Sequence, residues 1–596
     1  MRDCLIVLTL IYLLACEQNF VLAQADSTRR ESITKRAFRA GINLISTNPG
    51  DTITNEESTN DYVRHSGKII RAIIINRVGF ETSIYDSSKK GIGGVTRVAK
   101  ALHKSTRNGI IQKHLFMKPY TPLNPHMLAD NERFLRDKDF ILDSRIIAIP
   151  VEGTDSVDIA VITRDVFSLG ATLGGSLPTA PRIGVYDANV DGRGQRIEFT
   201  ALLDQDRAPK FGYALLYRKS SVFGSLANLE LGYTQLNSGV SIGDETEFAF
   251  LARLDRPLVS PYTRLAGGLE ISRNWSENVY RKPDSVFLNY NYRLVDTWLG
   301  YNLGIHRRIT DRNRYFMAVR FFDGYYIDQT ENQDALSEVK YNDAFGYLGE
   351  ITYYKRDFYK TRYIFGFGRT EDVPHGISVG VAAGYLRLRE VERPYSAVKF
   401  DYSRANKRGD IYQVQFQAGG YFRNHTIEDA ILRGQISYFT KLLNIDRYKM
   451  RHYISAVYSQ LFNQMVTNWL EVNKNDIPGF TTDSLEADKR VAVHLESVLY
   501  TPWSILGFRF APFTTVDMAA VKCVSCSDEA SKIFWGLSGG IRTRNENLIF
   551  GTIELKFTYI PSDEYGNSKF VVGFKQNLRV KNTGSFVNKP SLVSYN

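Results

Sequence analysis

The sequence predicts a mainly β protein, in which a small α+β domain precedes a transmembrane antiparallel β-barrel. From Phe167 onward, apolar and polar residues alternate with a period of two almost without interruption, as expected of strands with one apolar and one polar face. No stretch offers about eighteen consecutive apolar residues, so no membrane-spanning helix is expected. The 596 residues include 35 Tyr, 35 Phe and 45 Gly, and the mean hydropathy is −0.26. This composition fits a barrel in lipid, where only alternate residues face the membrane, although a soluble β protein would fit it as well.

The first 25 residues are predicted to be a secretory signal peptide. Arg2 precedes the apolar stretch Leu5–Ala15, which is too short to span a membrane as a stable helix. Small residues that suit signal-peptidase cleavage follow, at Ala23 and Ala25. A second interpretation stays open, in which a lipobox ends at Cys16 and this cysteine becomes a lipidated N-terminus.

Residues 67–165 are predicted to form the α+β domain, with the element order βααββ, and the polar residues 26–66 before it a flexible leader. The second helix has a clear start, because Asn124 is suited to the N-cap and Pro125 to the first helical position. The other expected elements are a strand over Lys68–Asn76, a helix with Val95, Val98, Ala99 and Leu102 on one face, and strands over Arg145–Val151 and Val157–Thr163 joined by the hairpin loop Glu152–Asp155.

Residues 166–580 are predicted to form the barrel, and residues 581–596 a C-terminal tail. Charged residues such as Glu554 and Lys556 alternate with Leu555 and Phe557, which indicates a wet interior and an apolar exterior, the reverse of a sandwich core. Counting the alternating stretches between residues 167 and 580 yields about twenty candidate strands.

No catalytic residue, metal ion or cofactor is predicted. Cys523 and Cys526 form a single C-x-x-C pair without two further ligands for zinc, so a local disulfide or two free thiols is expected. Ser378 lies in a G-x-S-x-G pattern, but that nucleophile motif requires a strand-to-helix turn, and this stretch is a strand candidate. The net charge of +11 comes without a clustered basic stripe, so nucleic acid is not an expected partner.

Several motifs occur in the order found in one protein family. NERFLRDKDFILDSRI (131–146) is followed by DVFSLG (165–170), then by GVYDANVDGRGQ (184–195), and later by Ile477-Pro478-Gly479-Phe480. With its motifs in this order, the chain resembles the BamA/TamA outer-membrane assembly family. The resemblance covers roughly residues 67–580. Members of the family join polypeptide-transport-associated (POTRA) domains to a surface-antigen-type β-barrel. The resemblance implies a barrel of about sixteen strands, fewer than the count from alternation. Only one POTRA-like unit is visible, which indicates a specialised relative.

The resemblance implies three candidate sites. The family's arginine in the lumen-loop motif is Pro478 here, so the charged contact of that arginine is not carried over. The open edge strand of the POTRA-like domain would bind clients, and Pro150 fits an edge because it lacks an N–H. The residues implied are Asp187, Asn189, Gly192 and Gly194 in a turn that opens the barrel, Ile477, Pro478, Gly479 and Phe480 in a loop folded into the lumen, and Arg145, Ile146, Ile147, Ala148, Ile149 and Val151 in the client-binding edge strand.

The expected function is non-enzymatic insertion or translocation of client proteins in the outer membrane of a Gram-negative bacterium, with the POTRA-like domain in the periplasm. Expected partners are unfolded outer-membrane or secreted proteins and the lipid bilayer, and the resemblance also raises accessory assembly lipoproteins. The alternative is a passive or solute-selective outer-membrane channel. An outer-membrane enzyme such as a lipase lacks a credible catalytic set.

Overall fold

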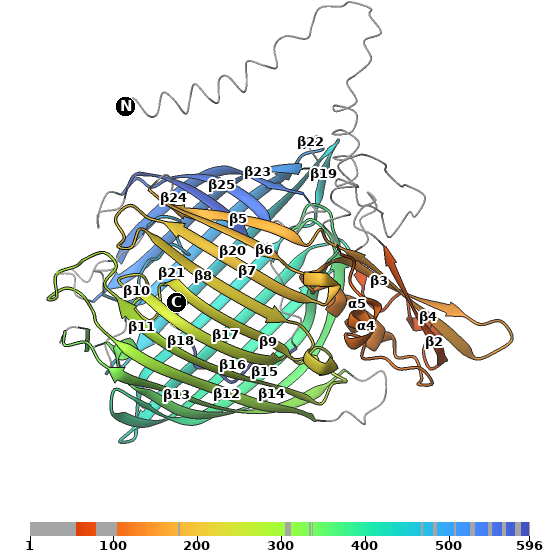
Figure 1. Ribbon diagram of the computed structural model, residues 1–596, viewed down its shortest axis with the longest axis horizontal. Helices are drawn as coiled ribbons and strands as arrows, with labels where there is room; N and C mark the ends of the chain where they lie inside the picture. The colour runs from red at the N-terminus through yellow and green to blue at the C-terminus, as the bar shows by residue number, and fades with distance from the viewer. Residues whose placement is uncertain are drawn as a thin grey trace, which may run out of the picture.

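The structure is a computed structural model (Figure 1). Its described residues are 55–78, 104–176, 179–303, 312–332, 335–336, 338–465, 469–480, 486–505, 508–524, 531–545, 551–562, 568–577 and 586–594. The predicted signal peptide with Cys16, Ala23 and Ala25, the helix expected around Val95–Leu102, and Cys526 lie outside the described residues.

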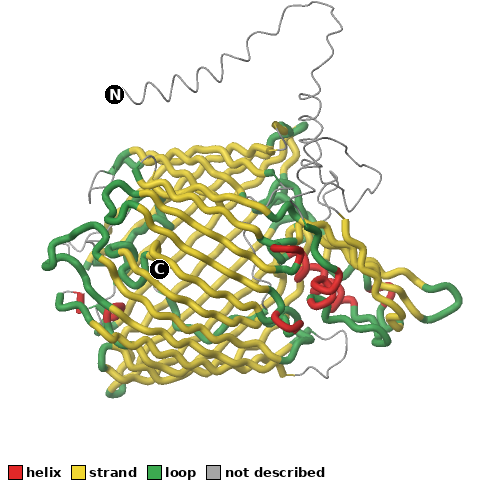
Figure 2. Tube along the Cα trace, viewed as in Figure 1, coloured by secondary structure: helices red, strands yellow, loops and turns green. Residues whose placement is uncertain are grey.

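The α+β unit (residues 67–165) contains a three-stranded sheet with the strand order β2-β4-β3. Strands β2 and β4 are parallel, and β3 pairs with β4 in the antiparallel direction. The two helices among the described residues of the unit lie between this sheet and the barrel, as Figures 1 and 2 show. The described elements are β2 (Ile69–Val78), α4 (Asn108–Lys113), α5 (Pro125–Arg136), β3 (Ile141–Pro150) and β4 (Ser156–Asp165).

Helix α5 begins where the sequence predicts. The Asn124 side chain accepts hydrogen bonds from the backbone N–H groups of His126 (3.0 Å) and Met127 (3.3 Å), and Pro125 occupies the first helical position. Leu128 and Leu135 are fully buried against the sheet side of the unit. The cap and the apolar face together therefore specify this helix from local sequence.

The second sheet is a nearly closed antiparallel barrel. Its 23 strands include three short ones, β1 (Glu56–Glu57), β19 (Leu443–Ile445) and β22 (Ser504–Ile505), which leaves twenty wall strands within the described residues. Neighbours along the chain are neighbours in the wall, and β9 pairs with β10. The wall strands are β5 (Leu169–Ser176), β6 (Ala180–Asp187), β7 (Gln195–Leu203), β8 (Phe211–Lys219), β9 (Asn228–Asn237), β10 (Thr246–Arg256), β11 (Leu265–Glu277), β12 (Asn291–Leu303), β13 (Arg314–Asp328), β14 (Ala344–Thr361), β15 (Glu371–Leu388), β16 (Val391–Ala405), β17 (Ile411–Arg423), β18 (Thr426–Phe439), β20 (Tyr448–Phe462), β21 (Ala487–Tyr500), β23 (Phe508–Cys523), β24 (Ser531–Arg544), β25 (Thr552–Tyr559) and β26 (Phe570–Asn577).

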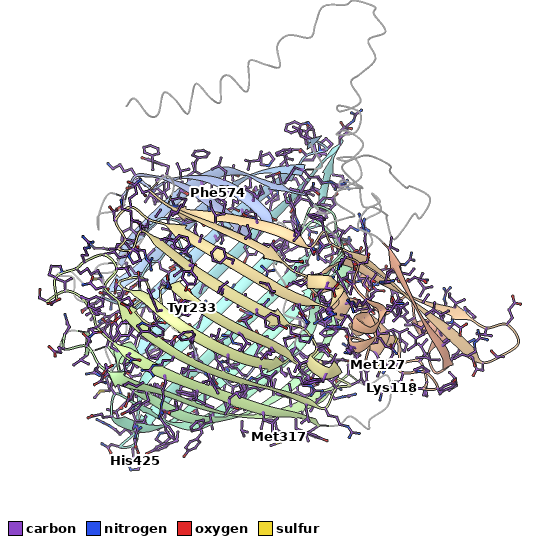
Figure 3. The ribbon with its side chains drawn as sticks, viewed as in Figure 1. Lys118, Met127, Tyr233, Met317, His425 and Phe574 are labelled. Atoms are coloured by element: carbon purple, nitrogen blue, oxygen red, sulfur yellow. The ribbon has the colours of Figure 1, made fainter. Side chains whose placement is uncertain are left out.

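The wall is apolar outside and polar inside. In β13, Val319 is 64% exposed on the outer side, whereas the adjacent Ala318 is 5% exposed and Arg320 forms an ion pair with Asp296 at 2.8 Å. Met317 and Phe574, labelled in Figure 3, likewise carry exposed apolar side chains. This arrangement confirms the inside-out pattern expected of a barrel in lipid.

The twenty strands confirm the number obtained from alternation and exceed the number implied by the resemblance. Short motifs mark single turns and loops. They do not report how many strands the wall contains. That number is the number of alternating stretches in the chain, and the barrel diameter increases with it.

Part of the stretch expected to be a flexible leader is folded. Glu56 and Glu57 form β1, which pairs with Lys360 and Tyr359 at the end of β14. Tyr62 follows and is 1% exposed within the core of the α+β unit. Residues 55–66 therefore join the unit to the barrel, through contacts that a polar composition does not reveal.

Candidate functional site: edge strand, lumen loop and seam

Strand β3 lies at an edge of the three-stranded sheet and pairs with β4 alone. Successive residues of an antiparallel edge strand direct their backbone groups alternately toward the partner and away from it. Arg145, Ile147 and Ile149 face β4, while Ile146 and Ala148 direct their N–H and C=O groups to the open side. The sequence-predicted edge residues therefore fall into two groups, and Val151 lies past the end of β3, with its N–H bonded to Ser156 O at 3.0 Å.

Much of the open side of β3 is already occupied by side chains. Glu132 accepts a hydrogen bond from the N–H of Ile146 at 2.8 Å, and the Tyr62 hydroxyl donates to the carbonyl oxygen of Ile146 at 3.1 Å. Arg136 donates to the carbonyl oxygen of Ser144 at 3.0 Å. Among the described residues, Ala148 keeps an unpartnered outward N–H, so the available edge is short.

Helix α5 also anchors the unit on the barrel through buried charges. Glu132 pairs with Arg136 at 2.6 Å and with Lys360 of β14 at 2.9 Å, and Arg136 reaches Asp372 of β15 at 2.8 Å. Burial alone would raise the pKa of Glu132, but Lys360 and Arg136 outweigh it and hold this pKa well below its usual range. Burial likewise opposes the charge on Arg136, whose pKa is nevertheless raised by Asp372 and Glu132.

Two further contacts extend this interface. Asp130 pairs with Arg312, which precedes β13, at 3.2 Å, and accepts a hydrogen bond from Ser260 at 2.8 Å. The Arg133 guanidinium lies 3.9 Å from the centre of the Phe358 ring. Sequence reasoning missed this charged face of α5. The signal available was a helix with charge on several faces, which is typical of helices that bridge two folded parts.

The barrel-opening turn is a joint between the barrel and the α+β unit. Asn189 donates to Thr106 Oγ1 at 2.9 Å and accepts from the N–H of Gly194 at 2.8 Å, while the N–H of Asn189 donates to Asp187 at 2.9 Å. Gly192 has φ +67°, and a Cβ there would lie 2.4 Å from the carbonyl oxygen of Ser105. Glycine is required at this position because the two parts of the chain approach so closely.

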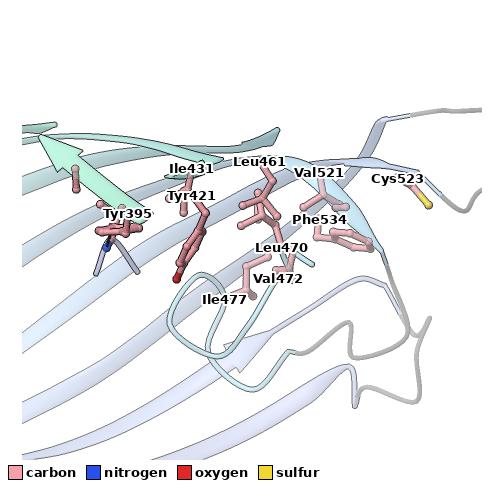
Figure 4. Close-up of a cluster of buried hydrophobic side chains, with 14 of the residues drawn as sticks. Tyr395, Tyr421, Ile431, Leu461, Leu470, Val472, Ile477, Val521, Cys523 and Phe534 are labelled. Carbon is pink, nitrogen blue, oxygen red and sulfur yellow. Dashed lines mark hydrogen bonds between the residues drawn. The ribbon is translucent and has the colours of Figure 1, made fainter. Parts of the chain in front are cut away.

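The lumen-loop motif lies in residues 469–480, between β20 and β21 (Figure 4). Ile477 and Phe480 are fully buried against inward-facing wall residues, and the Phe480 and Phe534 rings are 4.8 Å apart. Gly479 has φ +83°, and Pro478 is half-buried. The charged contact with the wall comes from Asp476, which pairs with Arg490 of β21 at 3.2 Å.

The seam between β26 and β5 is unlike the rest of the wall. The two strands are hydrogen-bonded neighbours that close the wall, but over the described residues they share far fewer contacts than any other pair of neighbouring wall strands. The Gln576 side chain also connects them: it accepts from the N–H of Leu173 at 3.0 Å and donates to the carbonyl oxygen of Ala171 at 2.9 Å.

The lumen is polar and partly filled. Residues 586–594 cross it, and a cavity of 670 Å³ remains beside them, bounded by Phe134 and Lys138 near α5. On the cavity wall, Arg218, Glu230, Arg253 and Glu270 form an ion-pair ladder across β8 to β11, with separations of 2.5, 3.3 and 2.9 Å.

The structure also places Ser378 and Cys523, which the sequence analysis considered for catalysis and metal binding. Ser378 lies within β15, opposite Tyr354 and Asp401. Cys523 is disulfide-bonded. Within the described ranges, no group of three His, Cys, Asp or Glu side chains is placed to hold a metal ion. No helix in the described part of the chain is long and apolar enough to cross a membrane.

These features define a class: a β-barrel with an apolar outer surface and a polar, partly filled lumen, which carries a small α+β unit at one end. No family model and no curated protein sequence matches the chain. Among solved structures, the chain is similar to BamA from Haemophilus ducreyi lacking POTRA domains 1–3 (11% identity, covering 94% of this chain and 96% of that chain, TM-score 0.32). It is also similar to CdiB from Acinetobacter baumannii (11%, 93% and 88%, TM-score 0.42) and CdiB from Escherichia coli (10%, 92% and 99%, TM-score 0.37). Identities and TM-scores this low describe a distant similarity.

Proposed function

We propose that the chain is an outer-membrane barrel that inserts or translocates client proteins, with its α+β unit in the periplasm acting as a POTRA-like docking domain. The observation that carries this proposal is the seam. Over the described residues, β26 and β5 share the fewest contacts of any neighbouring wall strands, and two of their hydrogen bonds run from Leu173 and Ala171 to the Gln576 side chain. Separating these two strands would therefore break fewer contacts than separating any other pair. Each such hydrogen bond contributes only about 0.5–1.5 kcal/mol net.

A parted seam would present two strand edges to an incoming chain. Exposed edges offer unpaired N–H and C=O groups that any extended segment can satisfy, whatever its side chains. Such a site suits a protein that handles many clients in the bilayer. Accessory lipoproteins would bind outside the contacts described above.

Client docking on β3 would begin at its Pro150 end, where Ile149 is 46% exposed, whereas Ala148 is 7% exposed. Extending the added strand past Ile146 requires Glu132 to release the N–H of Ile146, because that carboxylate occupies it. Glu132 also holds Lys360 of the barrel. Strand addition would therefore weaken the contact between α5 and the barrel. Client docking on β3 would in this way change the contacts at the end of the lumen.

The contents of the lumen favour this role over a passive or solute-selective channel. The loop 469–480 and residues 586–594 both lie against inward-facing wall residues, and α5 is fixed at one end of the barrel by buried ion pairs. Steady conductance would require these segments to leave a continuous water path.

A reducible cross-link across the seam tests the proposal. In a strain depleted of the native chain, a variant with Leu173→Cys and Gln576→Cys is bridged by a short thiol-specific reagent. The matched control is Leu173→Cys with Ile183→Cys, which bridges β5 to its paired neighbour β6. We expect the seam cross-link to reproduce the depletion defect in outer-membrane or secreted proteins, and reduction to reverse it, whereas the control has no effect.

Two outcomes contradict the proposal. Normal protein composition with a fully cross-linked seam would rule out seam opening. No change in outer-membrane or medium proteins on depletion, together with steady conductance of the purified barrel, would favour the channel.

A further inference from the structure

Residues 586–594, the tail segment, occupy a groove inside the barrel rather than its surface. The segment starts at the end that carries the α+β unit, where Phe586 is 1% exposed. Its ring packs 5.5 Å from the ring of Phe358, at 87°, and 5.9 Å from that of Tyr354. The Arg133 guanidinium of α5 lies 5.3 Å from the same ring. An aromatic pocket closed by cations therefore anchors one end of the segment.

The middle of the tail segment is held by charge. The Lys589 ammonium forms an ion pair with Asp296 of β12, and Arg320 of β13 donates to the carbonyl oxygen of Pro590 at 3.0 Å. Lys399 of β16 donates to the Ser591 hydroxyl at 3.0 Å. The segment thus passes across several wall strands as it leaves the α+β end.

The last part of the segment reaches the cluster that contains the lumen loop. Val593 is 5% exposed, belongs to the same buried cluster as Ile477 and Phe480, and donates its N–H to the Tyr395 hydroxyl at 2.9 Å. Leu592 packs against that cluster. The tail segment therefore connects the end that carries α5 with the end that carries the lumen loop.

Much of this recognition is directed at backbone. The N–H of Phe586 donates to Leu258 O at 2.9 Å, and the carbonyl of Phe586 accepts from Arg356 at 3.4 Å. Together with the contacts to Pro590 O and Val593 N, four backbone groups of the segment are bound. Backbone contacts accept any extended chain, while pockets for alternate side chains select among them. The side-chain requirements are an aromatic residue, a cation three positions later and an aliphatic pair after three more.

We propose that this groove is a binding site for extended client segments with that pattern, and that the tail segment occupies it as a competing, tethered ligand. The inference rests on the proposed function, because it names the segment that a client would present in the lumen. Tethering gives the tail an effective concentration of about 1 mM. A free segment would therefore bind the full chain weakly until the tail leaves the groove.

Peptide binding to the purified barrel in detergent tests the site without any transport. The labelled probe has the sequence FVNKPSLVS of residues 586–594, and the barrel is either the full chain or a chain that ends at Ser585. We expect the shortened chain to bind the probe about 100-fold more tightly than the full chain, if the untethered dissociation constant is about 10 μM. Heat-modifiable gel mobility checks that both barrels are folded.

Matched peptides and one wall variant test the chemistry. Replacing the probe lysine by glutamate should weaken binding at least tenfold, and Asp296→Asn should shrink the difference between these two peptides. An unrelated peptide with the same aromatic, cation and aliphatic spacing should compete, whereas its acidic counterpart should not.

A folded, shortened barrel that binds none of the peptides, or binds the lysine and glutamate forms equally, overturns the site. Failure of peptide binding with normal client delivery removes the groove and leaves the proposed function intact. Tight, charge-dependent binding with unchanged outer-membrane and secreted proteins on depletion overturns the proposed function instead, and reduces the groove's ligand to the chain's own tail.

Discussion

Glu132 is the residue at which the α+β unit, its edge strand and the barrel meet. One carboxylate oxygen receives the N–H of Ile146 and the Tyr62 hydroxyl, and the other pairs with Arg136 and Lys360. Removing one partner from a buried ion pair costs about 3–5 kcal/mol, because the other charge is left uncompensated. A change in the contacts of Glu132 with β3 therefore also affects its contacts with Arg136 and with Lys360 of the barrel.

Gly479 of the lumen loop should tolerate no side chain. Its φ of +83° is unfavourable for residues with a Cβ, and a Cβ would lie 2.8 Å from the Val571 side chain. We expect Gly479→Asp to lower barrel stability by about 2 kcal/mol or more, measured as the temperature at which gel mobility changes. Gly434→Ala in β18 is the control, because a Cβ there meets nothing within 4 Å. Equal effects of the two substitutions would contradict the close contact.

His114 should make the α+β unit sensitive to acid. Burial, followed by nearby Lys138, lowers the pKa of His114 to about 3 from its ordinary 6.5. Below about pH 6.5 the unfolded chain therefore binds a proton that the folded unit does not bind until about pH 3. Stability is lost as pH falls through this window, by up to about 1.4 kcal/mol per pH unit.

Hydrogen exchange of the unit between pH 6.5 and 4.5 measures this loss. His114→Phe keeps a ring beside Phe134 and Phe140 and should flatten the pH dependence in this range. Glu132 contributes only at lower pH: its folded pKa is depressed, so its contribution is present above its ordinary value of 4.5 and lost below it. An unchanged slope in the Phe variant would exclude His114 as the source.

At the scale of single elements, β3 shows why an edge strand is not automatically a docking site. The sheet order leaves β3 open, but α5 and Tyr62 reach around the sheet and occupy the backbone groups of Ser144 and Ile146. The strand remains available only toward its Pro150 end. Local sequence predicts the strand and its edge position, whereas the occupied groups depend on helix packing.

Proline substitutions separate docking from folding in this strand. Ala148→Pro removes the outward N–H and leaves the ladder to β4 largely intact, so cross-linking of unfolded outer-membrane chains to the unit should fall severalfold. Ile147→Pro removes a ladder donor instead and should destabilise the unit by about 1 kcal/mol or more. Hydrogen exchange of β4 distinguishes the two effects. Full cross-linking in a folded Ala148→Pro variant would remove strand addition at this edge from the mechanism.

At the scale of the whole molecule, the barrel functions as a frame for segments held inside it. Helix α5 closes on one end, the loop 469–480 packs near the other, and the tail segment joins their surroundings. The neighbouring wall strands with the fewest described contacts are β26 and β5 at the seam, where the Gln576 side chain adds two hydrogen bonds. A wall whose strands are paired throughout, with one seam of few contacts, is suited to conformational change when a bound chain displaces the loop 469–480 or the tail segment.

The sequence by itself determined the elements whose causes are local. A period of two along the wall predicted the inside-out barrel and its twenty strands, and Asn124 with Pro125 predicted the start of α5. Tertiary structure alone decided the contacts between distant residues: Arg136 with Asp372, 236 positions apart, and Lys589 with Asp296, 293 positions apart. The position of the tail segment, the occupied edge of β3 and the lateral seam all follow from such pairings. No window of sequence contains both partners of these contacts, because closure of the wall brings them together.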